Sequence, residues 1–329
     1  MATMSKKERV RAAIAGREVD HVPVSMWGHD FLREWSSEDL AAQTAESYRA
    51  NDWDFIKLNP RSTYFAEAWG NQYQRSAEQA SPALTTKVIN SAADLYKVDV
   101  VDGTSGVFGE HITALKLVLA DVGEEVDVLF TLFSPLSVVA QLSGGVGRPL
   151  TTFAEEDPAA THSAIQAAAQ TLTQYGEAAL EAGAAGVFFA PLQWASQRAC
   201  SPDFYREFGR PYDLQVLQRL READFNILHT CGNDNMMELL LDYPVHALNW
   251  ADQGRGNVSL AEARALTDKT LVGGVAHDRL TELRPDEIAA QVSAALGTGP
   301  TNLIVTGGCA IPPLTPAAAT RAVVSAVRG

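Results

Sequence analysis

The sequence predicts an α/β protein built as a single (β/α)8 barrel of the TIM type. Eight short apolar runs, rich in β-branched and aromatic residues, each end near glycine, proline or a polar residue. Stretches rich in Ala, Glu and Leu with helical spacing lie between most of them, and no linker rich in Pro, Gly or Ser divides the 329 residues. Strands that alternate with helices pair in parallel, and eight such units close a barrel. We therefore predict one domain over residues 1–329.

The eight apolar runs are the predicted strands of this barrel. In chain order they span residues 22–27, 55–59, 126–133, 186–191, 225–231, 247–252, 271–276 and 303–308.

Helices are predicted on both sides of these runs. Ser5 and Glu8 fit a capping box that opens a first helix through Ala15, and Gly16 then ends it. Helical spacing predicts further helices over residues 157–182, 202–223, 259–266, 285–296 and 316–327.

Two segments lack a clear pattern. Residues 64–125 are the least regular, and within them we expect residues 98–109 to form a hairpin or excursion over the barrel mouth. The glycine-rich run 143–147 matches no nucleotide-binding pattern, and we predict a turn there.

Composition excludes several classes of protein. The net charge of −14 would repel a phosphate backbone, so nucleic-acid binding is disfavoured. The basic N-terminus is not followed by an apolar run of signal-peptide length, which predicts a cytoplasmic protein without membrane attachment. Three cysteines in so long a chain do not indicate a disulfide framework. Reduced thiols are therefore available to bind a metal.

Two strand ends carry the residues most typical of a metal site. Residues 227–232 read Ile-Leu-His-Thr-Cys-Gly, and residues 303–309 read Leu-Ile-Val-Thr-Gly-Gly-Cys. Side chains two apart on a strand point the same way, so His229 and Cys231 share a face. Barrel chemistry gathers at the C-terminal ends of strands, where Cys309 also lies. A spacing of 77 residues between the cysteines excludes a zinc finger. We predict a zinc site with three protein ligands and one open position, as in catalytic zinc sites.

Structural roles compete with this interpretation. A buried cysteine usually acts as a small core hydrophobe, and we expect this of Cys200. A single histidine after apolar residues is also usually a core group. His229, Cys231 and Cys309 together, at strand ends of one barrel, favour the metal.

Three segments resemble a known family. They are residues 7–24, which contain Lys-Glu-Arg-Val and Gly-Arg-Glu-Val-Asp-His-Val-Pro-Val, residues 188–195, Phe-Phe-Ala-Pro-Leu-Gln-Trp-Ala, and residues 308–316, Gly-Cys-Ala-Ile-Pro-Pro-Leu-Thr-Pro. The chain resembles the uroporphyrinogen decarboxylase superfamily over nearly its whole length. Within it, the chain is most similar to the cobalamin-dependent methyltransferases that bind zinc through a His-x-Cys…Cys set. The resemblance implies a barrel with His229, Cys231 and Cys309 as zinc ligands and catalytic residues, and it admits a homodimer.

One segment separates the branches of that family. True uroporphyrinogen decarboxylases carry Arg-Gln-Ala-Gly-Arg-Tyr after the first strand, where cations hold the carboxylates of the substrate. Here residues 26–33 read Met-Trp-Gly-His-Asp-Phe-Leu-Arg, without the arginine cluster. Because charge-assisted pairs dominate such recognition, decarboxylation of that substrate is disfavoured.

The expected chemistry is methyl transfer to a thiol. Zinc removes the proton of a bound thiol and holds the resulting thiolate. In the resembled methyltransferases this thiolate exchanges a methyl group with a corrinoid carried by a separate partner protein. Two cysteine thiolates and a neutral imidazole cancel the charge of the zinc, which favours alkyl transfer over hydrolysis.

Further residues at or beyond the strand ends are candidates for lining a substrate site. Asp252 is also a candidate hydrogen-bond partner of His229 or a cap for the helix near Ser259, and Glu67 a candidate near the metal. The predicted substrate-contacting residues are Asn59, Glu67, Gln193, Trp194, Asn249, Trp250, Asp252 and His277.

Two other functions are compatible with the sequence. The first is a cofactor-independent decarboxylase like uroporphyrinogen decarboxylase, which needs cationic anchors. The second is a non-catalytic zinc-binding member, in which the protein supplies a fourth ligand such as Glu67.

Overall fold

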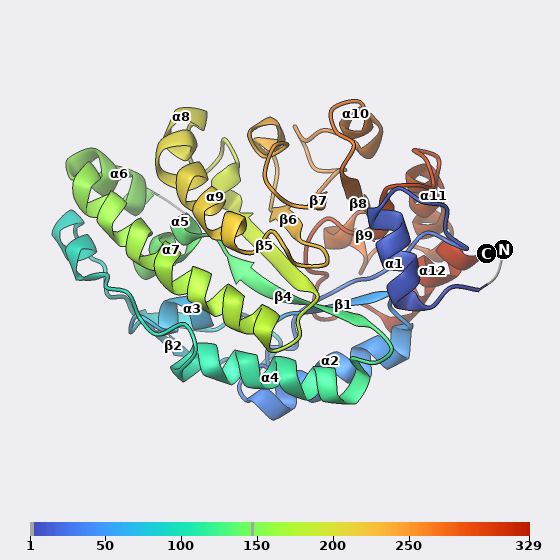
Figure 1. Ribbon diagram of the computed structural model, residues 1–329, viewed down its shortest axis with the longest axis horizontal. Coiled ribbons are helices and arrows are strands. Elements are labelled where there is room, and N and C mark those ends of the chain that lie inside the picture. The colour runs from blue at the N-terminus through green and yellow to red at the C-terminus, as the bar shows by residue number, and fades with distance from the viewer. Residues whose placement is uncertain (1–2, 146–147) are drawn as a thin grey trace.

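A curled parallel β-sheet surrounded by helices forms the body of the protein (Figure 1). The computed structural model describes residues 3–145 and 148–329. Within them, seven strands pair in parallel in the order β1-β4-β5-β6-β7-β8-β9. These strands are β1 (Phe55–Leu58), β4 (Asp127–Phe133), β5 (Gly186–Leu192), β6 (Ile227–Thr230), β7 (Ala247–Trp250), β8 (Thr270–Val275) and β9 (Leu303–Gly307).

The predicted first strand, residues 22–27, occupies the remaining place in the ring as an irregular segment. Val24 pairs in parallel with Val305 of β9, and the Val305 N–H donates to the Pro23 carbonyl at 2.9 Å. On the other side, the Asp54 N–H donates to the Val24 carbonyl at 2.9 Å. Pro23 has no N–H to donate, so this segment cannot form a full ladder. The TIM-type barrel is confirmed, with seven regular strands and one bridging segment.

Helices cover the outside of the sheet. They are α1 (Lys6–Ile14), α2 (Ser37–Asn51), α3 (Tyr64–Glu67), α4 (Gly106–Val122), α5 (Pro135–Leu142), α6 (Arg148–Glu156), α7 (Pro158–Glu181), α8 (Pro202–Phe204), α9 (Arg210–Arg219), α10 (Leu260–Arg264), α11 (Pro285–Leu296) and α12 (Ala317–Arg328). No helix in the described ranges is both long and apolar enough to cross a membrane. The single-domain organisation over residues 1–329 stays a prediction.

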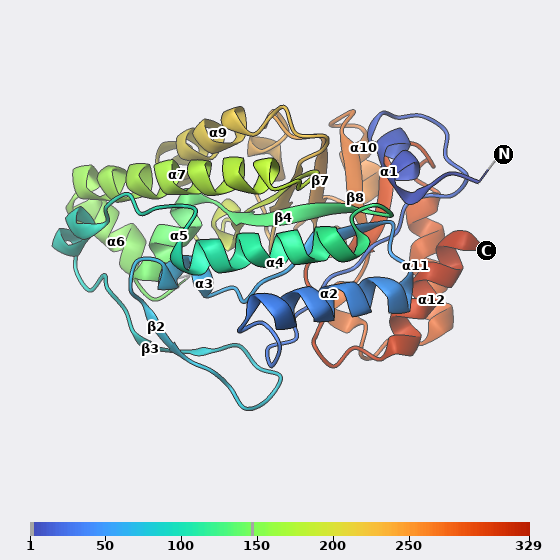
Figure 2. The ribbon, with the colours of Figure 1, turned by 60° about the horizontal axis from the view of Figure 1, so that its bottom comes forward.

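Two predicted elements differ from the structure. Residues 98–105 form no hairpin, and residues 106–109 begin α4; the prediction of a hairpin over residues 98–109 is therefore wrong. The hairpin lies earlier, as β2 (Gln72–Gln74) and β3 (Ala83–Thr86), and it projects from the body below α3 (Figure 2). The helix predicted over residues 202–223 contains a π turn at Tyr205–Gly209, because Pro211 lacks an N–H for regular pairing. Of the turn predicted over 143–147, residues 143–145 form a turn or bend, and residues 146–147 lie outside the described ranges.

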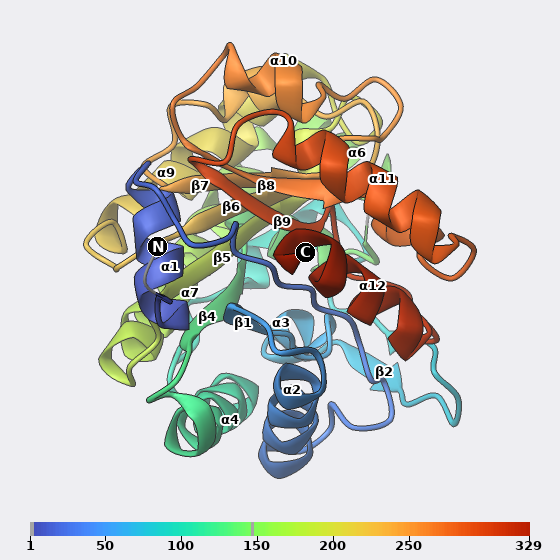
Figure 3. The ribbon, with the colours of Figure 1, turned by 90° about the vertical axis from the view of Figure 1, so that its right-hand side faces the viewer.

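The apolar core has two layers. The larger layer lies between the sheet and the helices. The smaller layer fills the inside of the ring with inward-facing residues of successive strands, among them Phe55, Leu129, Ile227, Val272 and Ile304. Val10 of α1 joins this inner layer, so α1 covers the end of the ring where the strands begin (Figure 3).

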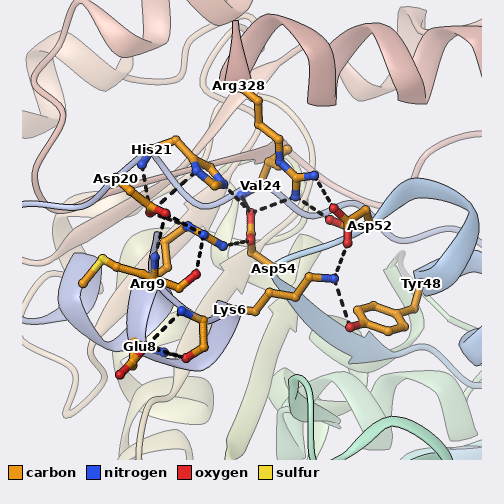
Figure 4. Close-up of polar contacts among 12 residues, drawn as sticks. Lys6, Glu8, Arg9, Asp20, His21, Val24, Tyr48, Asp52, Asp54 and Arg328 are labelled. Atoms are coloured by element: carbon orange, nitrogen blue, oxygen red, sulfur yellow. Dashed lines mark hydrogen bonds and ion pairs between the residues drawn. The ribbon is translucent and has the colours of Figure 1, made fainter. Parts of the chain in front are cut away.

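A buried ion-pair cluster joins the two ends of the chain beneath this layer (Figure 4). The fully buried Asp54 carboxylate accepts from the Arg9 guanidinium at 2.7 Å and from the Val24 N–H at 2.8 Å. Arg9 also donates to Asp20, and Arg328 of the last helix lies 3.7 Å from Asp54. The cluster therefore connects α1, the bridging segment, β1 and α12.

Asp54→Ala should lower the free energy of unfolding by about 3–5 kcal/mol, because it leaves the buried Arg9 charge and the Val24 N–H without this partner. The matched control is Glu177→Ala, which breaks the exposed Glu177–Arg219 pair and should cost about 1 kcal/mol or less. Urea unfolding followed by circular dichroism measures both. Equal costs for the two variants would contradict this role of Asp54.

The same cluster predicts loss of stability in acid. The hydrogen bond from Arg9 holds the pKa of Asp20 well below its usual range. The folded state thus binds the proton of Asp20 less readily than the unfolded chain, whose Asp pKa is about 3.9. This contribution is present above that pH and is lost as the pH falls toward the folded-state pKa. Asp20→Asn should flatten the dependence of unfolding free energy on pH below about 4. An unchanged slope in urea titrations would contradict it.

Candidate metal centre

Strand alternation brings the three predicted metal ligands together inside the ring. His229 and Cys231 lie at and just after the end of β6, and Cys309 follows β9. The His229 Nε2 atom is 2.8 Å from Cys231 Sγ and 3.5 Å from Cys309 Sγ, and the two sulfur atoms are 3.5 Å apart. Among the described residues, no fourth His, Cys, Asp or Glu side chain joins this group. One imidazole and two thiols are a donor set that suits zinc.

Asn249 fixes the orientation of the His229 ring. In the parallel pairing of β6 and β7, His229 lies opposite Asn249. The Asn249 Nδ2 group donates to the carbonyls of Val272 at 2.8 Å and Gly307 at 3.1 Å, which directs its Oδ1 toward the ring. His229 Nδ1 donates to this Oδ1 at 2.6 Å. The Nε2 atom therefore keeps its lone pair and faces the two sulfurs.

The two thiols of the site differ electrostatically. The hydrogen bond from the Cys231 thiol lowers the pKa of Cys309 well below the ordinary value for a thiol. One sulfur of the pair is thus readily deprotonated, which is the form that binds a metal. Cys200 lies elsewhere and is buried, with its Sγ 3.3 Å from the Trp194 carbonyl. Burial raises the pKa of Cys200 to about 12, which agrees with the predicted core role.

A cavity of about 260 Å³ opens beside the three ligands. Aromatic and apolar groups make up much of its wall, including Trp27, Phe133, Phe188 and Leu192. Three of the predicted substrate-contacting residues also line it, namely Asn59, Gln193 and Trp194.

The other predicted substrate-contacting residues lie elsewhere. The described wall of the cavity contains none of Glu67, Asn249, Trp250, Asp252 and His277.

Two of these residues are held by partners away from the ligands. Glu67 pairs with Arg61 at 2.9 Å and accepts from the Thr63 hydroxyl at 2.6 Å, so it is not beside the metal site. Trp250 is fully buried and donates to the Val258 carbonyl at 2.7 Å.

Two roles predicted for Asp252 are wrong, namely the hydrogen bond to His229 and the cap of the helix near Ser259. Its carboxylate accepts from the Gly274 N–H at 2.9 Å, whereas Asn249 bonds to His229. The helix α10 is capped by Ser259 itself. His277 begins a 3₁₀ turn beyond β8.

Lys57 is the main residue of the site that sequence reasoning missed. It occupies the inward face of β1, two residues before Asn59, and is 7% exposed. Its Nζ donates to Asn59 Oδ1 and lies 4.8 Å from the centre of the Phe188 ring. Lys57 is a charged residue inside the apolar run 55–59, and it faces the same side of the strand as Asn59. This pattern is the sequence signal that could have identified Lys57.

Comparison with known protein families identifies the family of this chain. A family model described as Uroporphyrinogen decarboxylase (URO-D) matches residues 5–329. The chain belongs to the uroporphyrinogen decarboxylase family. This confirms the resemblance predicted from the sequence.

The relatives that match are methyltransferases of this family. A methylcobamide:CoM methyltransferase, MtbA of Methanosarcina mazei, is 22% identical over 97% of this chain and 96% of its own length. A second, MtaA of Methanosarcina barkeri, is 24% identical over 99% of this chain and 98% of its own length. These matches confirm that the chain is an enzyme of the methyltransferase branch.

Solved structures support the same fold. A methyltransferase from Methanosarcina mazei superposes with a TM-score of 0.86 at 22% identity, covering 98% of both chains. A B12-independent methionine synthase from Shewanella sp. W3-18-1 gives a TM-score of 0.61 at 13% identity, covering 93% of this chain and 91% of its own.

Asn249→Ala should weaken zinc binding by about 10- to 100-fold, because His229 loses the bond that fixes its tautomer and orientation. The matched control is Asp252→Asn, which alters a nearby carboxylate that does not touch His229 and should leave zinc affinity unchanged. Competition with a coloured chelator measures both dissociation constants. The assignment fails if the two variants bind zinc equally well.

Proposed function

We propose that the protein is a zinc-dependent methyltransferase that moves a methyl group between a corrinoid carrier and a small thiol. The observation that carries this proposal is the convergence of His229, Cys231 and Cys309 on one point beside a cavity. Zinc bound there would favour the deprotonated form of a bound thiol and so supply a nucleophilic sulfur. We further propose a cytoplasmic enzyme.

The protein residues prepare the site for this chemistry. Asn249 holds the neutral imidazole with Nε2 toward the metal, and the two cysteine sulfurs supply negative charge. The aromatic wall formed by Trp27, Phe133 and Phe188 limits the access of water to the reacting sulfur. We propose that Asn59, Gln193 and Trp194 contact the rest of the thiol.

The size of the cavity supports a reaction in which this protein binds the thiol and a second protein carries the corrinoid. About 260 Å³ falls below the usual range for sites that enclose drug-sized ligands, about 300–1,000 Å³. A small thiol fits such a space, whereas a corrin ring does not. We therefore propose that a separate corrinoid-binding protein presents the methyl group at the mouth of the barrel. The names of the relatives support a methylated corrinoid as the methyl donor.

Decarboxylation of a polycarboxylate tetrapyrrole is less well supported. Such a substrate needs several cations, and among the described residues of the cavity wall Lys57 is the only lysine or arginine. The non-catalytic alternative needs a fourth protein ligand, and Glu67 is instead bound to Arg61 and Thr63.

Zinc-replete wild-type protein should contain about one zinc per chain, and Cys309→Ser should lose most of it, because zinc sites of this kind depend on thiolate ligands. Elemental analysis measures the metal. With methylcobalamin as donor and 2-mercaptoethanesulfonate as acceptor, the wild type should demethylate the corrinoid, followed by absorbance, and Cys309→Ser should not. Cys200→Ser is the control and should keep both zinc and activity. The proposal is overturned if carefully zinc-loaded wild type holds no metal.

A further inference from the structure

Lys57 is a buried ammonium beside the metal ligands that forms no ion pair with a carboxylate among the described residues. It lies on the inward face of β1, and its Nζ is 4.8 Å from the ring centre of Phe188 and 5.8 Å from that of Trp27. The His229 ring packs against the same Phe188 ring, with centres 5.0 Å apart. One aromatic side chain thus contacts both the ammonium and a proposed metal ligand.

Lys57 lines the same cavity as His229, Cys231 and Cys309. Burial lowers the pKa of Lys57 to about 7, and the sulfur of Cys309 and the carboxylate of Glu34 oppose this shift. Glu34 is already engaged, since its carboxylate lies 3.0 Å from His29 Nδ1 and accepts from the Asp30 N–H at 2.9 Å. A buried charge is costly unless another charge offsets it. Because Glu34 is engaged elsewhere, the negative charge that offsets the Lys57 ammonium must lie at the sulfur site.

The proposed reaction supplies that charge. A divalent metal held by two thiolates and a neutral imidazole is formally neutral. A thiol that binds beside it loses its S–H proton to solvent and brings one negative charge into the cavity. When this thiolate takes the methyl group from the corrinoid, an S–C bond forms and the Co–C bond breaks with its electron pair left on the cobalt. The sulfur then becomes a neutral thioether, and the negative charge leaves the cavity with the corrinoid.

We propose that Lys57 balances the charge of the acceptor sulfur, so that the site binds a thiolate more tightly than the thioether product. This inference rests on the proposed function. It assigns to Lys57 an electrostatic action on the reacting sulfur, and not a contact with some acidic group elsewhere on the substrate. Removal of the ammonium should weaken thiol binding and leave thioether binding almost unchanged.

The test uses thiol binding to the cobalt(II)-loaded full-length protein, read from the sulfur-to-cobalt absorbance, so no corrinoid turnover is needed. Lys57→Met should raise the dissociation constant of the neutral thiol 2-mercaptoethanol by about 10- to 100-fold. The inhibition constant of its neutral methyl thioether, measured by competition, should change by about threefold or less. Lys57→Arg keeps the charge and should restore most of the thiol affinity.

Lys269→Met is the matched control. Lys269 is also partly buried, and burial lowers its pKa, but it precedes β8 at the opposite end of the strands and donates to the Val245 carbonyl at 2.8 Å. This variant should bind the thiol like the wild type. All variants should hold about one cobalt per chain at saturation.

Several results would overturn the inference. Lys57→Met could leave thiol binding unchanged, weaken thiol and thioether equally, or lose cobalt that Lys57→Arg retains. A loss of affinity for 2-mercaptoethanesulfonate without a loss for 2-mercaptoethanol would assign Lys57 to an acidic substrate group instead. If the wild type itself binds no cobalt or no thiol, the proposed function fails. If the wild type binds the thiol and Lys57→Met binds it equally, only the role of Lys57 fails.

Discussion

Closure of the ring between β9 and β1 is the constraint on which the rest of the structure depends. The bridging segment 22–27 pairs with β9 through Val24 and Val305, and the Ser25 hydroxyl donates to the Phe55 carbonyl of β1 at 2.7 Å. Farther along, the Ile311 N–H donates to the Trp27 carbonyl at 2.8 Å, just after Cys309. Cys309 must face His229 across the inside of the ring. If the ring were open between β9 and β1, β9 and the Cys309 that follows it would be free to move. Closure therefore keeps Cys309 close to His229 and Cys231.

The buried Asp54 cluster stabilises the same seam from the opposite end. The carboxylate binds the bridging segment through the Val24 N–H and α1 through Arg9 (Figure 4). Buried charges of this kind are costly to leave unpaired, so arrangements of α1, α12 and β1 that separate these partners are disfavoured. Barrels of this type usually separate stability at the start of the strands from chemistry at their ends. In this protein the Asp54 cluster lies at the strand starts and the candidate metal site at the strand ends.

Local pattern was enough to predict the strands and the convergence of His229, Cys231 and Cys309, but not the other contacts between distant segments. Apolar alternation placed His229 and Cys231 on one face and located all eight members of the ring, although Pro23 makes the first an irregular segment. The hairpin β2–β3 was missed because its strands are short and mostly exposed, without an apolar run. Asn249, and not Asp252, supports His229 because the register between β6 and β7 sets them opposite each other. A single sequence does not reveal that register.

The alternation inside the ring explains why Lys57 and the metal ligands occur together. Toward the strand starts, the inward residues Phe55, Ile227 and Ala247 form a dry apolar layer. Two residues later on the same strands come Lys57, His229 and Asn249, so the polar groups begin directly above that layer. Electrostatic interactions strengthen where water is excluded, and a charge placed at this depth acts on its neighbours more strongly than one at the open mouth. The apolar layer thus lies directly beneath the described polar groups of the cavity, which include Lys57 and the three candidate metal ligands. With Lys57 as the one lysine or arginine of its described wall, the cavity suits a small substrate of low charge better than a substrate with many carboxylates.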